Sequence, residues 1–178
     1  DALFHRVNTV FEEDIRKKNL QYHADLDIRH HYVVCDQTKL QEIMLNLISN
    51  AIKYTPEGHS IHVEIHEAAS ENPSKIHYIF SCEDTGIGMS EEYLPHIYEE
   101  FSREHTTTEN KVLGSGLGLS IIKSMIELMG GSIQVESRQG IGTKFTVDFS
   151  FDIASKEEVY GNQNTMKPPA IHTIKGTR

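Results

Sequence analysis

The sequence has no tryptophan, only two cysteines and no apolar run long enough to cross a membrane. Cys35 and Cys82 each lie in an apolar, strand-like run, and no Cys-x-x-Cys pair occurs. We therefore expect two buried free thiols, and not a disulfide or a zinc site. No secretion signal is recognisable at the start of the chain. These absences lead us to expect a protein of the reducing cytoplasm.

Positive charge is also scarce. The chain has 17 Lys and Arg against 26 Asp and Glu, a formal net charge of −9 at pH 7. Such a balance argues against nucleic acid as a partner, because nucleic-acid-binding faces are basic. With 178 residues, 38% hydrophobic and 24% charged, the composition is that of one soluble globular domain. Any site for an anionic ligand must therefore draw on a few local cations, and the candidates are Lys53, Arg103, His105 and Lys111.

The eleven histidines do not form a metal-binding pattern. His62 and His66 lie on the same side of a predicted strand, but four residues of strand separate them by about 13 Å. That distance is too great for them to share one ion. We expect most of the histidines at the surface.

Apolar periodicity divides the chain into helices and strands. Helices are predicted at 3–15, 37–55, 90–94 and 117–129, and strands at 22–28, 60–66, 76–83, 132–137 and 143–153. Gly130 and Gly131 end the last helix, and a turn at 140–142 joins the last two strands as a hairpin. Three main helices on one face of a mixed, five-stranded sheet make an α+β fold, a two-layer α/β sandwich. We expect residues 1–153 to form this domain and residues 154–178 to form a polar C-terminal linker.

The helix that begins after Asp36 has an unusual polar face. At about 100° per residue, its residues Glu42, Asn46, Asn50 and Lys53 fall within an arc of roughly 80°. An ordinary solvated face carries Lys, Glu and Gln, whereas Asn lowers helix propensity and offers a neutral oxygen donor. Magnesium bound to phosphates accepts such oxygens. The face therefore indicates a magnesium phosphate site, with a plain solvated face as the alternative.

Two glycine-rich segments follow, at 84–89 and 114–119. Glycine adopts positive φ and lets the backbone approach a ligand, so such segments suit the rim of an adenine pocket or a loop over phosphates. Either segment alone is a weak signal. Their order after the asparagine-bearing helix indicates binding of a nucleoside triphosphate. The polar stretch between 102 and 114 is predicted to be a mobile lid that orders on nucleotide.

Together these motifs resemble the catalytic, ATP-binding domain of a sensor histidine kinase. That family belongs to the GHKL superfamily, which includes gyrase, mismatch-repair and heat-shock chaperone ATPases. Segment 46–56 is similar to the family's asparagine motif, 84–89 and 114–119 to its two glycine motifs, and 97–103 to its phenylalanine motif. Tyr98 stands where Phe is usual and Ser115 where Thr is common. The similarity runs over about residues 1–152 and implies the Bergerat-type ATP-binding fold.

The resemblance implies a role for each residue at the phosphate end of the site. Asn50, with Asn46, would coordinate Mg²⁺ beside ATP. Glu42 would orient the reacting group or act as a base. Lys53 would meet phosphate, and Arg103 would clamp the terminal phosphate, for which a planar guanidinium is well shaped. Both cations also have a plain alternative as solvated surface charges.

At the base end, the resemblance implies that Tyr54 packs against adenine and that Asp84 accepts a hydrogen bond from its exocyclic amine. Guanine would set a carbonyl against that carboxylate, so ATP is expected to win over GTP. The alternatives are a turn residue for Asp84 and a core residue for Tyr54. The remaining nucleotide contacts implied are Gly86, Gly88, Met89, Phe101, Lys111, Gly114, Ser115, Gly116, Leu117, Gly118 and Leu119.

The family transfers the γ-phosphoryl group of ATP to a histidine on a helical dimerisation domain, in two-component signal transduction. No histidine here lies in the His-Glu-Leu-Arg-like context that the family uses, and the segment around His5 does not match it. We therefore expect the acceptor on a dimerisation domain of the same polypeptide, outside this chain. A response regulator or receiver domain is the expected downstream partner.

The resemblance also implies a location on the cytoplasmic side of a membrane-bound sensor, and the isolated domain is expected to be monomeric. The alternatives are a conformational ATPase of the chaperone or mismatch-repair kind, a serine kinase of the same superfamily, and a nucleotide-binding scaffold without catalysis.

Overall fold

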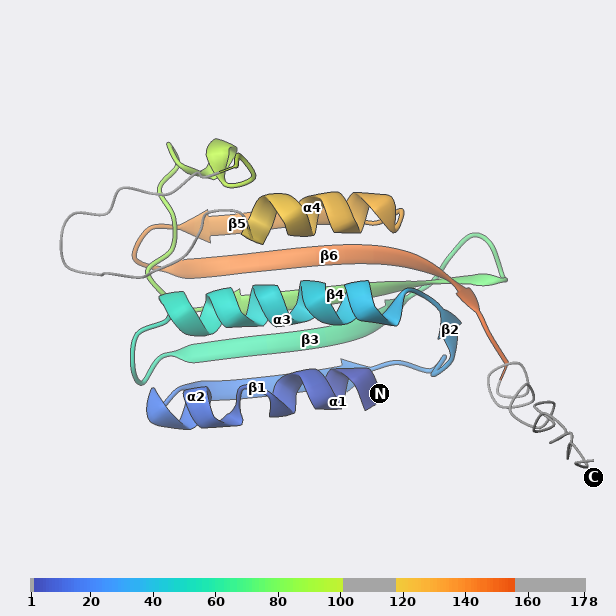
Figure 1. Ribbon diagram of the computed structural model, residues 1–178, viewed down its shortest axis with the longest axis horizontal. Helices are drawn as coiled ribbons and strands as arrows, with labels where there is room; N and C mark the ends of the chain where they lie inside the picture. Colours follow the sequence, from blue (N-terminus) through green and yellow to red (C-terminus); the bar gives the residue numbers. More distant parts are fainter. Residues whose placement is uncertain (1, 101–117, 156–178) are drawn as a thin grey trace, which may run out of the picture.

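The computed structural model describes residues 2–100 and 118–155, which form one mixed sheet with α-helices on one face (Figure 1). The helices are α1 (Ala2–Thr9), α2 (Glu12–Lys17), α3 (Gln37–Tyr54), the 3-10 helix η1 (Leu94–His96) and α4 (Gly118–Leu128). The strands are β1 (Gln21–Asp27), β2 (Val33–Val34), β3 (Ser60–Ala68), β4 (Lys75–Asp84), β5 (Ser132–Arg138) and β6 (Gly142–Ile153). No helix within the described ranges has both the length and the apolar character needed to cross a bilayer.

The strand order is β1-β3-β4-β6-β2, and β5 pairs with β6. Strands β1 and β3 are parallel, and the other neighbours are antiparallel. The expected α+β, two-layer sandwich is confirmed. In the described part of the chain, the numbers of strands and helices differ from the prediction. The two-residue strand β2 is a sixth strand, and the opening helix is divided into α1 and α2.

The core lies between the sheet and α3. Val63 of β3, Phe80 of β4 and Val147 of β6 are buried and belong to the same hydrophobic cluster as Leu47 and Ile48 of α3. This follows from the period-2 alternation of the strands and the 3.6-residue period of the helix. The N-terminus of α3 is the predicted one, because Oδ1 of Asp36 accepts a hydrogen bond from the amide of Lys39 at 3.0 Å.

The single opening helix predicted over 3–15 is wrong. The chain breaks between α1 and α2, where Val10 is 60% exposed and Phe11 is buried. At this point Asn8 Nδ2 donates to the carbonyl of Phe4 at 2.7 Å, and Thr9 Oγ1 donates to that of His5 at 3.0 Å. Short polar side chains that bond the backbone in this way compete with helix continuation. Apolar periodicity does not register that competition.

The short helix predicted at 90–94 is also wrong. Ser90 Oγ accepts a hydrogen bond from the amide of Tyr93 at 3.2 Å and forms a turn. Pro95 then lacks an amide donor, which removes one hydrogen bond from a continuing α-helix. Only the 3-10 turn η1 forms, over Leu94–His96.

Both cysteines are free, but the expectation of two buried thiols holds only for Cys82. Cys82 points from β4 into the core, whereas Cys35 is half-buried in the connection between β2 and α3. Burial raises the pKa of both thiols. None of the nine histidines within 2–100 and 118–155 is buried, as predicted.

Candidate functional site

The polar face of α3 brings the two predicted asparagines into contact. Asn50 Nδ2 donates to Asn46 Oδ1 at 3.1 Å. That bond does not use Oδ1 of Asn50, a neutral oxygen that can ligate a hard cation. Glu42 is exposed one turn earlier, and Lys53 Nζ lies 5.0 Å from the ring centroid of Tyr54, near the end of the helix. The four predicted polar residues thus follow one another along a single helix.

The first glycine segment packs against the C-terminal end of α3. The Gly86 amide donates to Oδ1 of Asp84 at 2.8 Å, and the Ile87 amide donates to the carbonyl of Tyr54 at 3.2 Å. A Cβ atom added at Gly86 would lie 2.5 Å from that Tyr54 oxygen, so only glycine fits there. The close approach places the Asp84 carboxylate and Tyr54 at the same end of the site.

The turn between β5 and β6 holds the other side of this segment. Gly88 has φ +62°, and a Cβ atom there would lie 2.0 Å from the carbonyl oxygen of Arg138. The Gly140 amide donates to the carbonyl of Ile87 at 2.7 Å, and the Met89 amide donates to Ser137 Oγ at 2.9 Å. The sequence predicted the hairpin but not this contact, which joins residues about fifty positions apart.

The start of α4 lies against the asparagine face. A Cβ atom added at Gly118 would be 3.1 Å from Nδ2 of Asn46. Leu119, the next residue of α4, packs partly buried against the core. The end of the second glycine segment therefore meets α3 two turns before Tyr54, since eight helical residues rise about 12 Å. The predicted lid lies outside the described residues. So do seven predicted site residues, which are Phe101, Arg103, Lys111, Gly114, Ser115, Gly116 and Leu117.

The carboxyl group of Asp84 is buried. Asp84 lies at the end of β4 and is only 8% exposed. Burial raises the pKa of this carboxyl to about 6, although the amides of Gly86 and Thr143 lower it, and Glu83 adds a small raising effect. A buried carboxylate with two amide partners still has unused acceptor capacity. Thr143 is a site residue that sequence reasoning missed, because it depends on the register between β4 and β6.

Acidic and imidazole groups do not assemble elsewhere into a metal centre. Across residues 2–100 and 118–155, no three His, Cys, Asp or Glu side chains gather closely enough to hold an ion. His62 instead pairs with Asp25 at 2.7 Å, and His66 lies 3.7 Å from Glu64.

The sequence is similar to that of known proteins. Residues 35–153 match the family described as histidine kinase-, DNA gyrase B-, and HSP90-like ATPase. The autoinducer 2 sensor kinase/phosphatase LuxQ of Vibrio cholerae serotype O1 is 32% identical over 153 residues, which cover 85% of this chain and 18% of LuxQ. The chain spans less than a fifth of the length of the LuxQ relatives that it matches.

Solved structures agree with the sequence relatives. The nucleotide-free catalytic domain of histidine kinase ThkA superposes with a TM-score of 0.67 at 29% identity, covering 84% of this chain and 92% of that one. ThkA in complex with the response regulator protein TrrA gives a TM-score of 0.62 at 27% identity, covering 84% and 39% of the two chains. The chain therefore belongs to the histidine kinase-, DNA gyrase B- and HSP90-like ATPase family, as an ATP-binding domain of the sensor histidine kinase type.

Proposed function

We propose that this domain binds ATP with Mg²⁺ and transfers the γ-phosphoryl group to a histidine on a dimerisation domain of the same polypeptide. A response regulator or receiver domain would then take up the phosphoryl group. The observation that carries the proposal is that the first glycine segment and Gly118, near the end of the second, both lie against α3. Gly86 and Ile87, which follow Asp84, meet Tyr54 at one end, and Gly118 meets Asn46 about 12 Å away. That separation suits a nucleotide lying along the helix with its base at Tyr54.

The base end favours adenine. An ionised Asp84 only accepts hydrogen bonds, and its two amide partners leave room for a donor from the ligand. The exocyclic amine of adenine supplies such a donor, whereas the carbonyl of guanine would face the carboxylate as a second acceptor. Tyr54 is 40% exposed, so its side chain has surface available for packing against a base.

The phosphate end fits magnesium. Asn46 and Asn50 offer neutral amide oxygens and no competing negative charge, and this donor set suits a hydrated Mg²⁺ shared with phosphate. When bound, the ion would neutralise phosphate charge during transfer. The residues' own contribution would be to hold the triphosphate between the asparagine face and the start of α4. Arg103 as a clamp on the terminal phosphate stays a prediction.

The acceptor would approach along α3 from beyond the phosphates. An open groove of about 550 Å³ includes Asn46 in its lining, together with Glu42 and Thr38 on α3 and Val10 and Phe11 between α1 and α2. Glu42 would face an incoming imidazole there, where it could orient the ring or accept its proton. Positioning and charge neutralisation would then supply most of the catalysis.

The test mixes this domain with the dimerisation domain of its own polypeptide and labelled ATP. We expect acid-labile, base-stable label on a histidine of the dimerisation domain. Asn50→Ala should remove both the label and the magnesium-dependent tightening of ATP binding seen by calorimetry with and without chelator, while the circular dichroism stays native. Label on serine, or ATP binding without any protein label, would reject histidine transfer in favour of the serine kinase or the scaffold.

A further inference from the structure

Lys18, in the turn between α2 and β1, bonds the C-terminal end of α3 from outside the helix. Its Nζ lies 2.6 Å from the carbonyl oxygen of Ile52, 3.2 Å from that of Lys53 and 2.9 Å from that of Thr55. An ammonium group has three donors, so Lys18 can direct all of them at this helix end. The last carbonyls of a helix have no partner within it, and a positive charge there is favourable. Lys18 is therefore a C-terminal cap supplied by a distant segment.

The turn that carries Lys18 is itself fixed. Asn19 has φ +50°, a left-handed conformation that asparagine tolerates, and the Leu20 amide donates to the carbonyl of Ile15 at 3.0 Å. The Lys18 carbonyl accepts a bond from the amide of Gly58 at 3.3 Å. These bonds join the α2–β1 turn to the turn that follows α3. The ammonium group thus has a defined position relative to the helix end.

Tyr54 lies between two of the residues that Lys18 holds, Lys53 and Thr55. Its own carbonyl is bonded by the amide of Ile87 in the first glycine segment, at 3.2 Å. The same oxygen is the atom that a side chain at Gly86 would strike. The segment beside Asp84 is therefore built on the backbone of the turn that Lys18 caps.

We propose that Lys18 is a positioning residue for base recognition, acting through Tyr54 on the segment that follows Asp84. The proposal rests on the proposed function, since it takes the base to lie at Tyr54 and Asp84. Without Lys18, three carbonyls of a partly buried helix end lose their donor, and the last turn loosens. The base end then loses its geometry, while the phosphate end at Asn46, two turns earlier, keeps it.

The experiment compares Lys18→Met, which keeps the apolar stem but removes the donors, with Lys18→Arg, which restores a cation with several donors. Lys17→Met is the matched control, because Lys17 pairs with Glu13 on the surface at 2.7 Å and is 64% exposed. Dissociation constants are measured for ATP, GTP and inorganic triphosphate with Mg²⁺, at a temperature where every variant is folded. Lys18→Gln, which retains an amide donor, replaces Lys18→Met if the latter does not fold.

We expect Lys18→Met to raise the dissociation constant of ATP by about fivefold to tenfold. This is the size of change that the loss of about one hydrogen bond produces. Binding of GTP and triphosphate should change less than about twofold, so that the preference for ATP falls. Lys18→Arg should recover most of the loss, and Lys17→Met should show none. In the nucleotide-free protein, hydrogen exchange at the Ile87 amide should quicken in Lys18→Met and stay unchanged in Lys17→Met.

Two results would overturn the role of Lys18 and leave the proposed function standing. One is an equal loss of affinity for ATP, GTP and triphosphate, and the other is an unchanged ATP preference together with unchanged exchange at Ile87. A wild-type protein that binds no ATP would refute the proposed function instead. In that case the exchange at Ile87 still decides whether Lys18 holds the glycine segment.

Discussion

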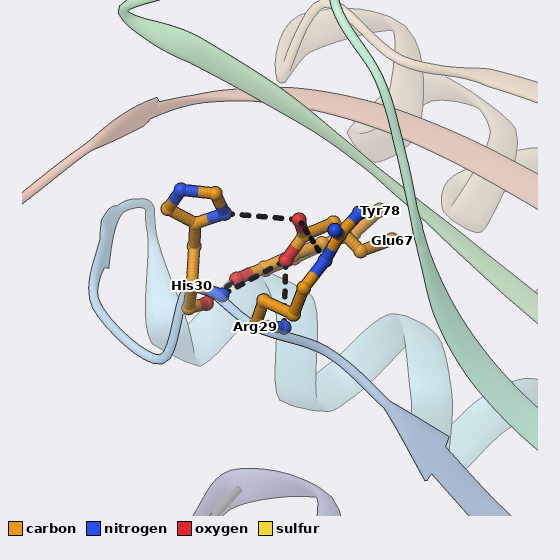
Figure 2. Close-up of polar contacts among 4 residues, drawn as sticks. All are labelled: Arg29, His30, Glu67 and Tyr78. Carbon is orange, nitrogen blue, oxygen red and sulfur yellow. Dashed lines mark hydrogen bonds and ion pairs between the residues drawn. The ribbon is translucent and has the colours of Figure 1, made fainter.

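Two carboxylates on the helix-covered face of the sheet have opposite surroundings. Asp84 ends β4, and Glu67 lies near the end of β3, about 20 Å away by strand register. Glu67 accepts hydrogen bonds from the amides of Arg29 and His30, both at 2.8 Å, and pairs with the His30 ring at 2.9 Å (Figure 2). Tyr78 donates its hydroxyl to the carbonyl of His30. Asp84 is bonded by two backbone amides, and within residues 2–100 and 118–155 no cation contributes to its pKa.

The pKa values follow these surroundings. Burial would raise the pKa of Glu67, but the amides of His30 and Arg29 and the His30 ring hold it below its usual range. For Asp84 burial prevails, and the pKa rises to about 6. Glu67 is thus saturated with partners and stabilises the fold, whereas Asp84 has two amide partners and acceptor capacity left for a ligand. Unfavourable groups of the second kind concentrate at functional sites.

The Glu67 cluster has a clear structural purpose. It fixes the crossing from β1 to β2, which leads through Cys35 to the N-terminus of α3. Strand β2 has only two residues, Val33 and Val34, paired with the end of β6. Such a short strand holds its connection weakly. The hydrogen bonds of the Glu67 carboxylate to Arg29 and His30 attach this connection to β3 as well.

The largest effect is expected from Glu67→Ala, which leaves two amides and the His30 ring without their acceptor. We expect the free energy of unfolding to fall by about 2–4 kcal/mol. The hydrogen bonds from the two backbone amides should contribute most, because the Arg29 side chain is largely exposed and its ion pair with Glu67 is weak. Urea unfolding at pH 7 measures it. Glu64→Ala is the control, since Glu64 lies on the same strand with only a 3.7 Å contact to His66. Equal losses in the two variants would contradict a saturated, stabilising Glu67.

The opposite sign is expected at the other end of the sheet, where Asp84→Asn should stabilise the nucleotide-free protein. The unfolded chain releases this proton at an ordinary aspartate pKa, about 4, and the folded protein holds it up to about 6. The contribution of Asp84 to stability is therefore fully present below about pH 4 and is lost as the pH rises through 6. At pH 8 the variant should gain at most about 2–3 kcal/mol, and below pH 4 nothing. Thermal unfolding across pH checks this, and a loss at pH 8 would show that Asp84 is as well satisfied as Glu67.

These two clusters show what the sequence could and could not predict. Helix α3, its cap at Asp36 and the strands from β3 to β6 follow from local periodicity and capping, and all were predicted. The break at Val10 and the 3-10 turn η1 were not, because side chains such as that of Asn8 bond the backbone there. The partners of Glu67 lie 37 and 38 residues away in sequence, and pattern reasoning does not reach contacts of that range.

The same limit applied within the site. The candidate residues on α3 were found because they share one helix face, and Asp84 because it precedes two glycines. Lys18 and Thr143 were missed, since each acts through a contact made only in the folded chain. Motifs thus identify groups that could touch a ligand, whereas the groups that position them depend on topology.

A smaller effect is expected on base selectivity as the pH changes. Below about pH 6 Asp84 gains a proton, so it can donate to the carbonyl of guanine and accepts less well from the amine of adenine. The ratio of ATP to GTP affinity should fall up to about tenfold between pH 7.5 and pH 5. The ratio is the right readout because both nucleotides carry the same phosphates. Asp84→Asn should show a flat ratio, and a flat ratio in the wild type would remove Asp84 from base recognition.

The smallest effect is expected from Tyr78→Phe, which removes one hydroxyl from the Glu67 cluster and leaves the bonds of Glu67 to the backbone intact. The hydroxyl donates to the carbonyl of His30, so its loss should lower the free energy of unfolding by about 1 kcal/mol. Since the cluster lies about 20 Å from Asp84, the loss in Tyr78→Phe and the gain in Asp84→Asn should combine additively in the double variant. ATP and GTP affinities of Tyr78→Phe should equal those of the wild type. A changed ATP to GTP ratio would show that the two ends of the sheet are coupled, and the separation of stability from recognition would then fail.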